Sequence, residues 1–238
     1  MKKKLVIDIH THTIASGHAY GTVEENVLAA KEKGLTGLGI SDHAPGVDPH
    51  TDPLSFAALR GIPRNLHGVN IYYGVENNVT NEGKMTLDES LLAALDYCIV
   101  GIHGTCYETR DTVTNTDNLI QCMAHPKTFF VSHPDDGYFP LGYERLVLAA
   151  KEHGVALEVN NAHIRNPWRK GTLENVRTYL DLCMKYQVPI FLGSDAHDPS
   201  QVGEFSDAVA LLDAIGFDEE LIINNDEERF RSFIGFDV

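Results

Sequence analysis

The sequence predicts an α/β fold: a barrel of seven parallel strands with one functional face. Apolar segments alternate with segments of helical periodicity, which is typical of repeated βα units and a parallel sheet. Six of the seven strand-like segments end in a histidine, glutamate or aspartate. If residues from nearly every strand end act together, these strand ends must face one common point. The C-terminal face of a barrel provides such a point, whereas an open sheet gathers its active residues at a single switch point between strands.

The expected elements follow one another with clear boundaries. We expect strands at residues 5–9, 36–41, 69–75, 97–102, 128–132, 155–160 and 189–194. Between and after them we expect helices at 22–34, 54–60, 88–94, 115–124, 143–153, 172–186, 206–215 and 226–233. Thr22 and Glu25 form a capping box at the start of the first helix. Gly154 ends the helix at 143–153. The irregular, proline-containing segment 44–67 is expected to cover part of the functional face.

Composition limits the class of protein. The chain has 238 residues, 43% hydrophobic and 22% charged, which suits one barrel domain spanning 1–238. The net charge of −15 argues against nucleic acid or an anionic membrane as a main partner. The first apolar run is too short for a signal peptide, and no window approaches the roughly 18 apolar residues of a membrane span. We expect a cytoplasmic protein whose four cysteines are free thiols.

The first two histidines introduce a functional hypothesis. His10 and His12 directly follow the apolar segment 5–9. Residues i and i+2 of a strand point to the same side, roughly 6.6 Å apart at about 3.3 Å per residue. The pair can therefore reach one metal ion if the strand curls at its end. Alone, the His-x-His pattern is weak evidence for a metal site. The hypothesis gains support because most of the later predicted strands also end in a residue type that binds metals.

Nine candidate metal ligands lie at or just beyond the predicted strand ends. They are His10, His12, His18, His43, Glu76, His103, His133, Asp195 and His197. Imidazole suits zinc, iron, copper and nickel, and a carboxylate can bridge two ions. Nine ligands are too many for one ion, whereas three ions would each keep positions open for water and substrate. The alternative is that each histidine is a satisfied loop residue, which would require all of them to follow strand ends by chance.

Six short motifs carry these residues in order along the chain. They are His10-Thr11-His12, Ser41-Asp42-His43, Gly74-Val75-Glu76, Gly101-Ile102-His103, Ser132-His133-Pro134 and Gly193-Ser194-Asp195-Ala196-His197. Together they resemble the motifs of the PHP family, the polymerase and histidinol phosphatase superfamily of metal-dependent phosphoesterases. The segment 15–20 and the last motif look closest to the stand-alone YcdX-like phosphatases. The resemblance covers essentially the whole chain and implies a distorted seven-stranded barrel with three metal ions.

The resemblance also implies how the ligands are shared. The first ion would be held by His10, His12, Glu76 and Asp195, the second by Glu76, His103 and His133, and the third by His18, His43 and His197. No ligand position is substituted, so nothing points to an inactive homologue. We expect zinc, with manganese or iron as alternatives, and we expect Glu76, Asp195 and His197 to be catalytic.

Such a centre would hydrolyse a small phosphate monoester. Two ions about 3.5–4 Å apart can share a hydroxide that is a nucleophile near neutral pH. This hydroxide would attack phosphorus in line with the leaving alcohol while the ions neutralise the phosphate oxygens. Asp195 or a metal-bound water would protonate the leaving oxygen, and the sequence leaves both open. Asp42 is a candidate for orienting a ligand histidine.

Three basic residues follow the sixth predicted strand, and we expect them to bind the substrate phosphate. They are Arg165, Arg169 and Lys170, and with Asn160, Asn161 and Trp168 they would form a pocket wall. The alternative is a solvated basic loop. His50 and His163 are further candidates for substrate contacts because they lie in loops on the same face.

Other functions stay open. Histidinol-phosphate phosphatase is an activity of the same superfamily, although no feature here is specific for an imidazole-bearing substrate. An amide or ester hydrolase on a metal-dependent barrel would also use strand-end histidines, but it often has a carboxylated lysine, and no predicted strand ends in lysine. A non-enzymatic alternative is a metal-storage module or a polymerase-associated module, and the latter fits poorly because the chain has no polymerase region and is strongly acidic. The YcdX-like resemblance favours a homo-oligomer, with a trimer first.

Overall fold

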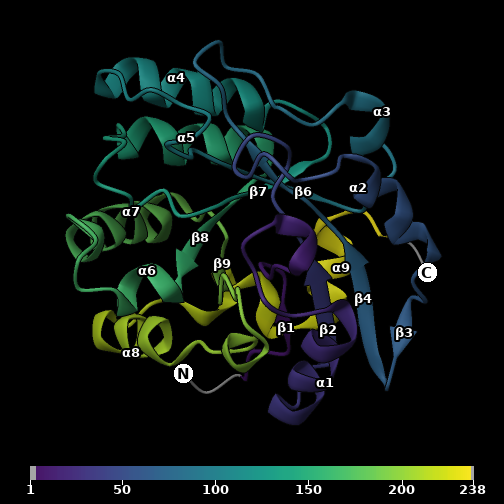
Figure 1. Ribbon diagram of the computed structural model, residues 1–238. Coiled ribbons are helices and arrows are strands. Elements are labelled where there is room, and N and C mark those ends of the chain that lie inside the picture. Colours follow the sequence, from purple (N-terminus) through teal and green to yellow (C-terminus); the bar gives the residue numbers. More distant parts are fainter. Residues whose placement is uncertain (1–3, 237–238) are drawn as a thin grey trace.

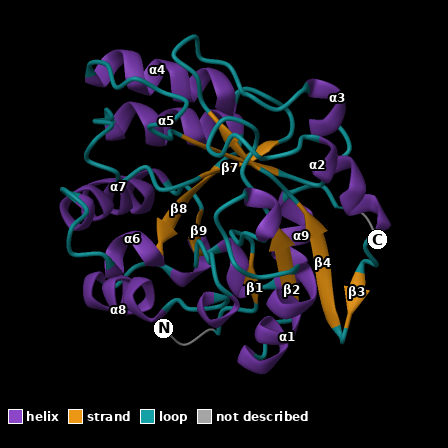
Figure 2. Ribbon diagram, viewed as in Figure 1, coloured by secondary structure: helices purple, strands orange, loops and turns teal. Residues whose placement is uncertain are grey.

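Short, mostly parallel strands form the centre of the structure, and helices cover their outer side (Figure 1, Figure 2). The structure is a computed structural model that describes residues 4–236. The strands of this range are β1 (Ile7–Asp8), β2 (Gly37–Ile40), β3 (Asn65–Leu66), β4 (Val69–Tyr73), β5 (Glu76–Asn78), β6 (Cys98–Gly101), β7 (Thr128–Val131), β8 (Ala156–Asn160) and β9 (Ile190–Gly193).

The strands belong to two sheets. Their orders are β1-β2-β4-β3 and β5-β6-β7-β8-β9, and all neighbours are parallel except β3 and β4. The predicted α/β fold with parallel strands is thereby confirmed. The strand count differs from seven, because the expected strand 69–75 is interrupted after Tyr73 and a short β3 pairs with β4. Glu76 therefore begins β5 of the second sheet instead of following a strand of the first.

The sheets meet at two seams, where single bridges replace a continuous ladder. At one seam Thr11 bridges Ala196, and the backbone N–H of Asp195 donates to the His10 carbonyl at 3.0 Å. At the other seam His43 bridges Glu76. The expected barrel is therefore not closed by continuous strand pairing. Both breaks lie beside candidate metal ligands.

Tyr97 explains two glycines near the second seam. Its ring is fully buried between the strands, and its hydroxyl donates to the Ile9 carbonyl at 2.7 Å. A Cβ atom at Gly39 or Gly74 would overlap this ring or its hydroxyl. Glycine at these positions thus lets the tyrosine lie across the interior between the two sheets.

An aromatic cluster fills the interior. It contains Ile7, Ile9, Tyr72, Tyr97, Ile99, Phe130, Ala156 and Phe191 from or beside the strands, and Ile223, Phe230 and Ile234 from the C-terminal segment. Helix α9 (Glu227–Phe233) brings Phe230 into this cluster. Asn224 joins the first and last strands: its amide nitrogen donates to the carbonyls of Ile7 (3.0 Å) and Leu192 (2.8 Å), and its oxygen accepts from the Leu192 N–H at 3.1 Å. An asparagine side chain therefore replaces strand pairing here.

The remaining helices lie mostly where the sequence predicts them. They are α1 (Val23–Lys33), α2 (Leu54–Ala58), α3 (Glu89–Leu92), α4 (Thr112–Met123), α5 (Tyr143–His153), α6 (Asn161–Arg165), α7 (Thr172–Tyr186) and α8 (Ser206–Ile215). The capping box of Thr22 and Glu25 is formed. Helix α6 lies in a segment expected as a loop. Within residues 4–236 no helix is both long and apolar enough to cross a membrane, and the four cysteines are free.

Candidate metal centre

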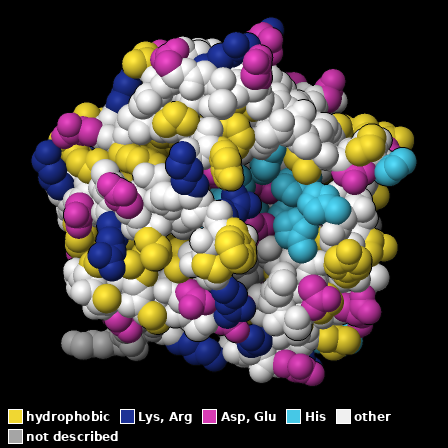
Figure 3. Space-filling view, turned by 60° about the vertical axis from the view of Figure 1, so that its left-hand side comes forward, with side chains coloured by type: hydrophobic (Ala, Val, Ile, Leu, Met, Phe, Trp, Pro, Cys, Tyr) yellow, Lys and Arg dark blue, Asp and Glu magenta, His cyan; other side chains and the backbone are white. Residues whose placement is uncertain are grey.

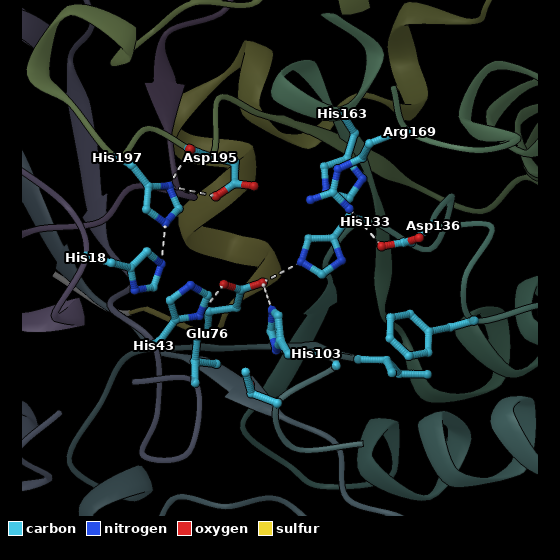
Figure 4. Close-up of a pocket in the computed structure, with 15 residues that line it drawn as sticks. His18, His43, Glu76, His103, His133, Asp136, His163, Arg169, Asp195 and His197 are labelled. Atoms are coloured by element: carbon cyan, nitrogen blue, oxygen red, sulfur yellow. Dashed lines mark hydrogen bonds and ion pairs between the residues drawn. The ribbon is translucent and has the colours of Figure 1, made fainter. Parts of the chain in front are cut away.

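Glu76 lies fully buried among imidazole rings (Figure 4). Its Oε1 lies 3.2 Å from His103 Nε2 and 2.9 Å from His133 Nε2. Its Oε2 lies 2.9 Å from His43 Nδ1 and 3.3 Å from His10 Nε2. One carboxylate thus faces four rings that come from both sheets, which is the arrangement of a bridging ligand.

Asp195 gathers the other candidates. Its Oδ1 lies 3.2 Å from His12 Nε2 and 3.5 Å from His10 Nε2. His197 Nε2 lies 3.0 Å from His18 Nε2, so the structure brings all nine predicted residues together. Two of the nine, Asp195 (φ 54°) and His133 (φ 29°), have left-handed backbones, which non-glycine residues adopt mainly at functional sites and turns.

Unpaired buried atoms show that the cluster fits divalent ions. His10 Nε2, His12 Nε2, His43 Nδ1 and Glu76 Oε2 are buried and, although each lies within 3.5 Å of another ligand atom, none of them makes a hydrogen bond, which is costly unless something else binds them. Three groups have ligand atoms within 4.8 Å of one another: His12 with His43 and His197, His10 with His12 and Glu76, and His43 with Glu76 and His103. Imidazole with carboxylate is a donor set suited to zinc and similar ions.

A serine and an aspartate orient His12. The Ser16 hydroxyl donates to Asp42 Oδ1 at 2.6 Å, so it accepts from His12 Nδ1 at 3.1 Å and also from the His43 N–H at 3.1 Å. The proton of His12 is thereby placed on Nδ1, and Nε2 has its lone pair free. Asp42 thus contacts a ligand histidine indirectly, since it acts on His12 through Ser16.

Glu158 was missed in the sequence. It lies fully buried in β8, with Oε1 2.6 Å from His10 Nδ1. Prediction from strand ends overlooks it because it lies in the middle of a strand. A signal did exist: a lone carboxylate in the otherwise apolar run 155–159 must have a polar partner if that run is buried.

Burial and neighbouring charges shift the pKa values of the cluster in opposite directions. Burial raises the pKa of Glu76, but the charges of His10, His103 and His43 hold it well below its usual range. Burial lowers the pKa of His103 to about 4. Burial also acts to lower the pKa of His133, but the hydrogen bond to Glu76 and its charge raise it to about 9. The carboxylate is therefore ionised at neutral pH, and an ion would have to displace a proton from His133.

The cluster opens into a cavity of about 300 Å³. In the space-filling view, histidine side chains gather at a hollow with basic side chains beside it (Figure 3). Beyond the candidate ligands the wall includes Phe139, His163, Asp136 and Arg169 (Figure 4). Arg169 Nη1 donates to Asp136 Oδ2 at 2.7 Å, and His163 Nδ1 lies 2.9 Å from Asp135 Oδ2. The wall therefore offers both cationic and acceptor groups to a substrate.

The three basic residues that were predicted to bind phosphate lie in different surroundings. Arg169 lines the cavity, whereas Arg165 Nε donates to Asp207 Oδ2 at 3.0 Å on α8. Lys170 lies outside the lining, and its backbone carbonyl accepts from the Gly137 N–H at 3.2 Å. His50 is exposed. Of the five candidate substrate contacts, Arg169 and His163 thus reach the cavity.

Comparison with known proteins settles the family. Residues 8–156, which include seven of the nine candidate ligands, match the family model of the PHP domain. The chain belongs to the PHP family. A "Probable phosphatase" of Syntrophotalea carbinolica is 35% identical over 236 residues, which cover 99% of this chain and 98% of that protein. A relative with the same name in Caldicellulosiruptor bescii is 37% identical over 231 residues, which cover 97% and 95%.

Solved structures of low identity share the fold. The structure titled histidinol phosphate phosphatase (HISK) from Lactococcus lactis, with zinc, L-histidinol and phosphate, has a TM-score of 0.58 at 16% identity and covers 90% of this chain and 95% of that one. A chain in the cryo-EM structure of archaeal ribonuclease P with mature tRNA has a TM-score of 0.62 at 18% identity and covers 97% and 90%. Because the two belong to such different systems, this fold alone does not specify an activity.

Proposed function

We propose that this PHP protein is a metal-dependent phosphatase that hydrolyses a small phosphate monoester at a three-ion centre. The observation that carries the proposal is the set of buried, unpaired imidazole and carboxylate atoms around Glu76, beside a cavity that Arg169 also lines. The names of the full-length relatives support it. So does the zinc in the structural neighbour.

The ligand sharing implied by the family is compatible with the observed distances. Glu76 would be the bridging residue, since both of its oxygens face histidines. The first ion would use His10, His12, Glu76 and Asp195, the second Glu76, His103 and His133, and the third His18, His43 and His197. Zinc is the first candidate, with manganese or iron as alternatives.

Divalent ions at these positions would supply activated water and positive charge for the phosphate oxygens. The protein supplies the rest. Arg169 uses one N–H on Asp136 and keeps other guanidinium donors for a phosphate oxygen. Asp195 is held by the Asn160 amide at 3.1 Å. Although burial raises the pKa of Asp195, the charge of His10 and the other histidines around it hold that pKa well below its usual range, so Asp195 is better suited to bind an ion than to start as the proton donor.

Phosphate release by the purified protein tests the proposal. The panel includes p-nitrophenyl phosphate and histidinol phosphate, each with zinc, with manganese and with chelator. Chelator-sensitive turnover of several monoesters is the expected result, and turnover confined to histidinol phosphate would instead assign the narrower activity. Inorganic phosphate should inhibit, which an amide or carboxylic ester hydrolase would not show. If metal-loaded protein releases phosphate from no ester, the proposed reaction is wrong.

A further inference from the structure

Glu158 contacts two candidate ligands from behind the metal centre. Its Oε1 lies 2.6 Å from His10 Nδ1. Its Oε2 accepts from the backbone N–H of His133 at 2.7 Å and from the Asn160 amide at 3.1 Å. Three donors therefore share the two oxygens of one buried carboxylate.

These contacts determine where His10 carries its proton. An ionised carboxylate only accepts hydrogen bonds. When His10 loses one ring proton so that it can bind an ion, the remaining proton must therefore lie on Nδ1, facing Glu158 Oε1. The lone pair of Nε2 then points toward Glu76 Oε2 at 3.3 Å and Asp195 Oδ1 at 3.5 Å, and Nε2 has no hydrogen-bond partner of its own. This is the tautomer that can bind an ion at Nε2.

Glu158 also links residues that follow three different strands. It holds the ring that follows β1 and the backbone turn that follows β7. The Asn160 amide, which donates to Glu158, also donates to Asp195 Oδ2 after β9 at 3.1 Å. The fold leaves space for this, because a Cβ atom at Gly193 would overlap Glu158 Oε1.

We propose that Glu158 is a positioning residue, which fixes the tautomer and direction of His10 and thereby sets the affinity for the ion that His10 binds. The inference rests on the proposed metal centre. Residues that hydrogen-bond to metal ligands typically change metal affinity or activity by about 10- to 100-fold when they are replaced.

Glu158→Gln tests this with almost no change in volume. Glutamine has one acceptor oxygen and one NH₂ group, so at least one of the three donors loses its acceptor. If the NH₂ group faces His10, the ring proton moves to Nε2 and the lone pair is then on Nδ1. Nε2 can no longer bind the ion in this tautomer. We expect zinc affinity, measured by competition with a chromophoric chelator, to fall about 10- to 100-fold. Excess zinc should restore most of the phosphate release.

Glu227→Gln is the matched control. Glu227 Oε1 accepts from the Tyr72 hydroxyl at 2.6 Å and the Asn70 amide at 2.7 Å, on β4 and away from the centre. This variant loses the same charge, and its zinc affinity should equal that of the wild type. Unchanged zinc affinity in Glu158→Gln would overturn the role of Glu158 while leaving the phosphatase proposal intact.

A spectrum of the wild-type protein gives a second test that needs no variant. In the zinc-loaded protein, ¹H–¹⁵N correlation of the histidine rings should show the His10 proton on Nδ1, hydrogen-bonded to a carboxylate. A His10 ring that binds zinc through Nδ1 would overturn the inference. Wild-type protein that binds no zinc, manganese or iron would overturn both this inference and the proposed function.

Discussion

At the scale of single residues, Arg169 is distinguished from its neighbours by the direction of its side chain. It lies in the cavity wall with one N–H on Asp136, whereas Arg165 pairs with Asp207. Sequence places both on the same short segment and cannot separate them. The side-chain partners decide which of them can meet a phosphate.

Arg169→Ala should raise KM for a phosphate monoester by roughly tenfold or more, because a charge-assisted hydrogen bond contributes about 1.5–3 kcal/mol. Arg165→Ala is the control from the same segment and should leave KM unchanged. Steady-state kinetics of both variants with p-nitrophenyl phosphate decides the matter. An unchanged KM in Arg169→Ala would remove Arg169 from the substrate site.

Asp8 gives the ion-free protein a pH-dependent stability. Burial raises the pKa of Asp8 from 3.8 to about 6, although hydrogen bonds from Ser194 and Gly203 act to lower it. Between these pH values the folded protein binds more protons than the unfolded chain, so the free energy of unfolding falls as pH rises. The shift corresponds to about 3 kcal/mol, fully lost above pH 7.

Asp8→Asn removes this dependence because asparagine does not ionise. Urea unfolding of chelator-treated wild type and variant from pH 5 to pH 8 measures it. The stability of Asp8→Asn relative to the wild type should increase as pH rises toward 7 and then stay constant. A difference that is independent of pH would show that Asp8 has an ordinary pKa in the folded protein.

At the scale of elements, the seams show what a sequence pattern could and could not provide. Strand ends were visible because apolar segments stop at polar residues such as His103 and His133, and the helices were visible from caps and periodicity. The break after Tyr73 was not, since Val75 continues the apolar run and only Gly74 marks it. Glu158 and Asn224 were missed because their partners lie far away in the sequence, at positions 10 and 7.

Asn224→Ala should destabilise the protein by about 3 kcal/mol or more, because it leaves buried backbone groups of Ile7 and Leu192 unpaired at about 1–3 kcal/mol each. Among residues 4–236, the side chain of the neighbouring Asn225 donates to one backbone carbonyl, that of Glu219, at 2.8 Å. Asn225→Ala should therefore cost about 1 kcal/mol. Urea unfolding of the two variants compares them, and equal losses would contradict the bridging role of Asn224.

At the scale of the whole molecule, the ligand groups span the two sheets. His12 and His43 belong to segments that follow β1 and β2, whereas His197 follows β9. The second group joins His10 and His12, which follow β1, to Glu76 of β5. The third joins His43, which follows β2, to Glu76 and to His103, which follows β6. Sequence could predict that these residues meet, but it could not show that they meet where the backbone pairing is interrupted.

Removal of metal should therefore loosen the seams more than the sheets. We expect a lower melting temperature with chelator. At a free ion concentration of 1,000 times the Kd, each bound ion adds about 4 kcal/mol to the free energy of unfolding. Hydrogen exchange should speed up most at the seam amides of His12 and Asp195, which donate across the gap at 2.9 and 3.0 Å. Amides between β8 and β9 are the internal control. Equal acceleration in both places would show that the ions do not join the sheets.

The interrupted strand pairing also affects how metal binding would stabilise the protein. In a continuous barrel the backbone would hold the two halves together whether or not metal were present. Here the backbone joins the two sheets at each seam through a bridge and a few hydrogen bonds instead of a continuous ladder, and bound ions would add a further link between the sheets. We therefore expect the metal-free protein to open first at its seams and to be cut by proteases faster than the metal-loaded protein.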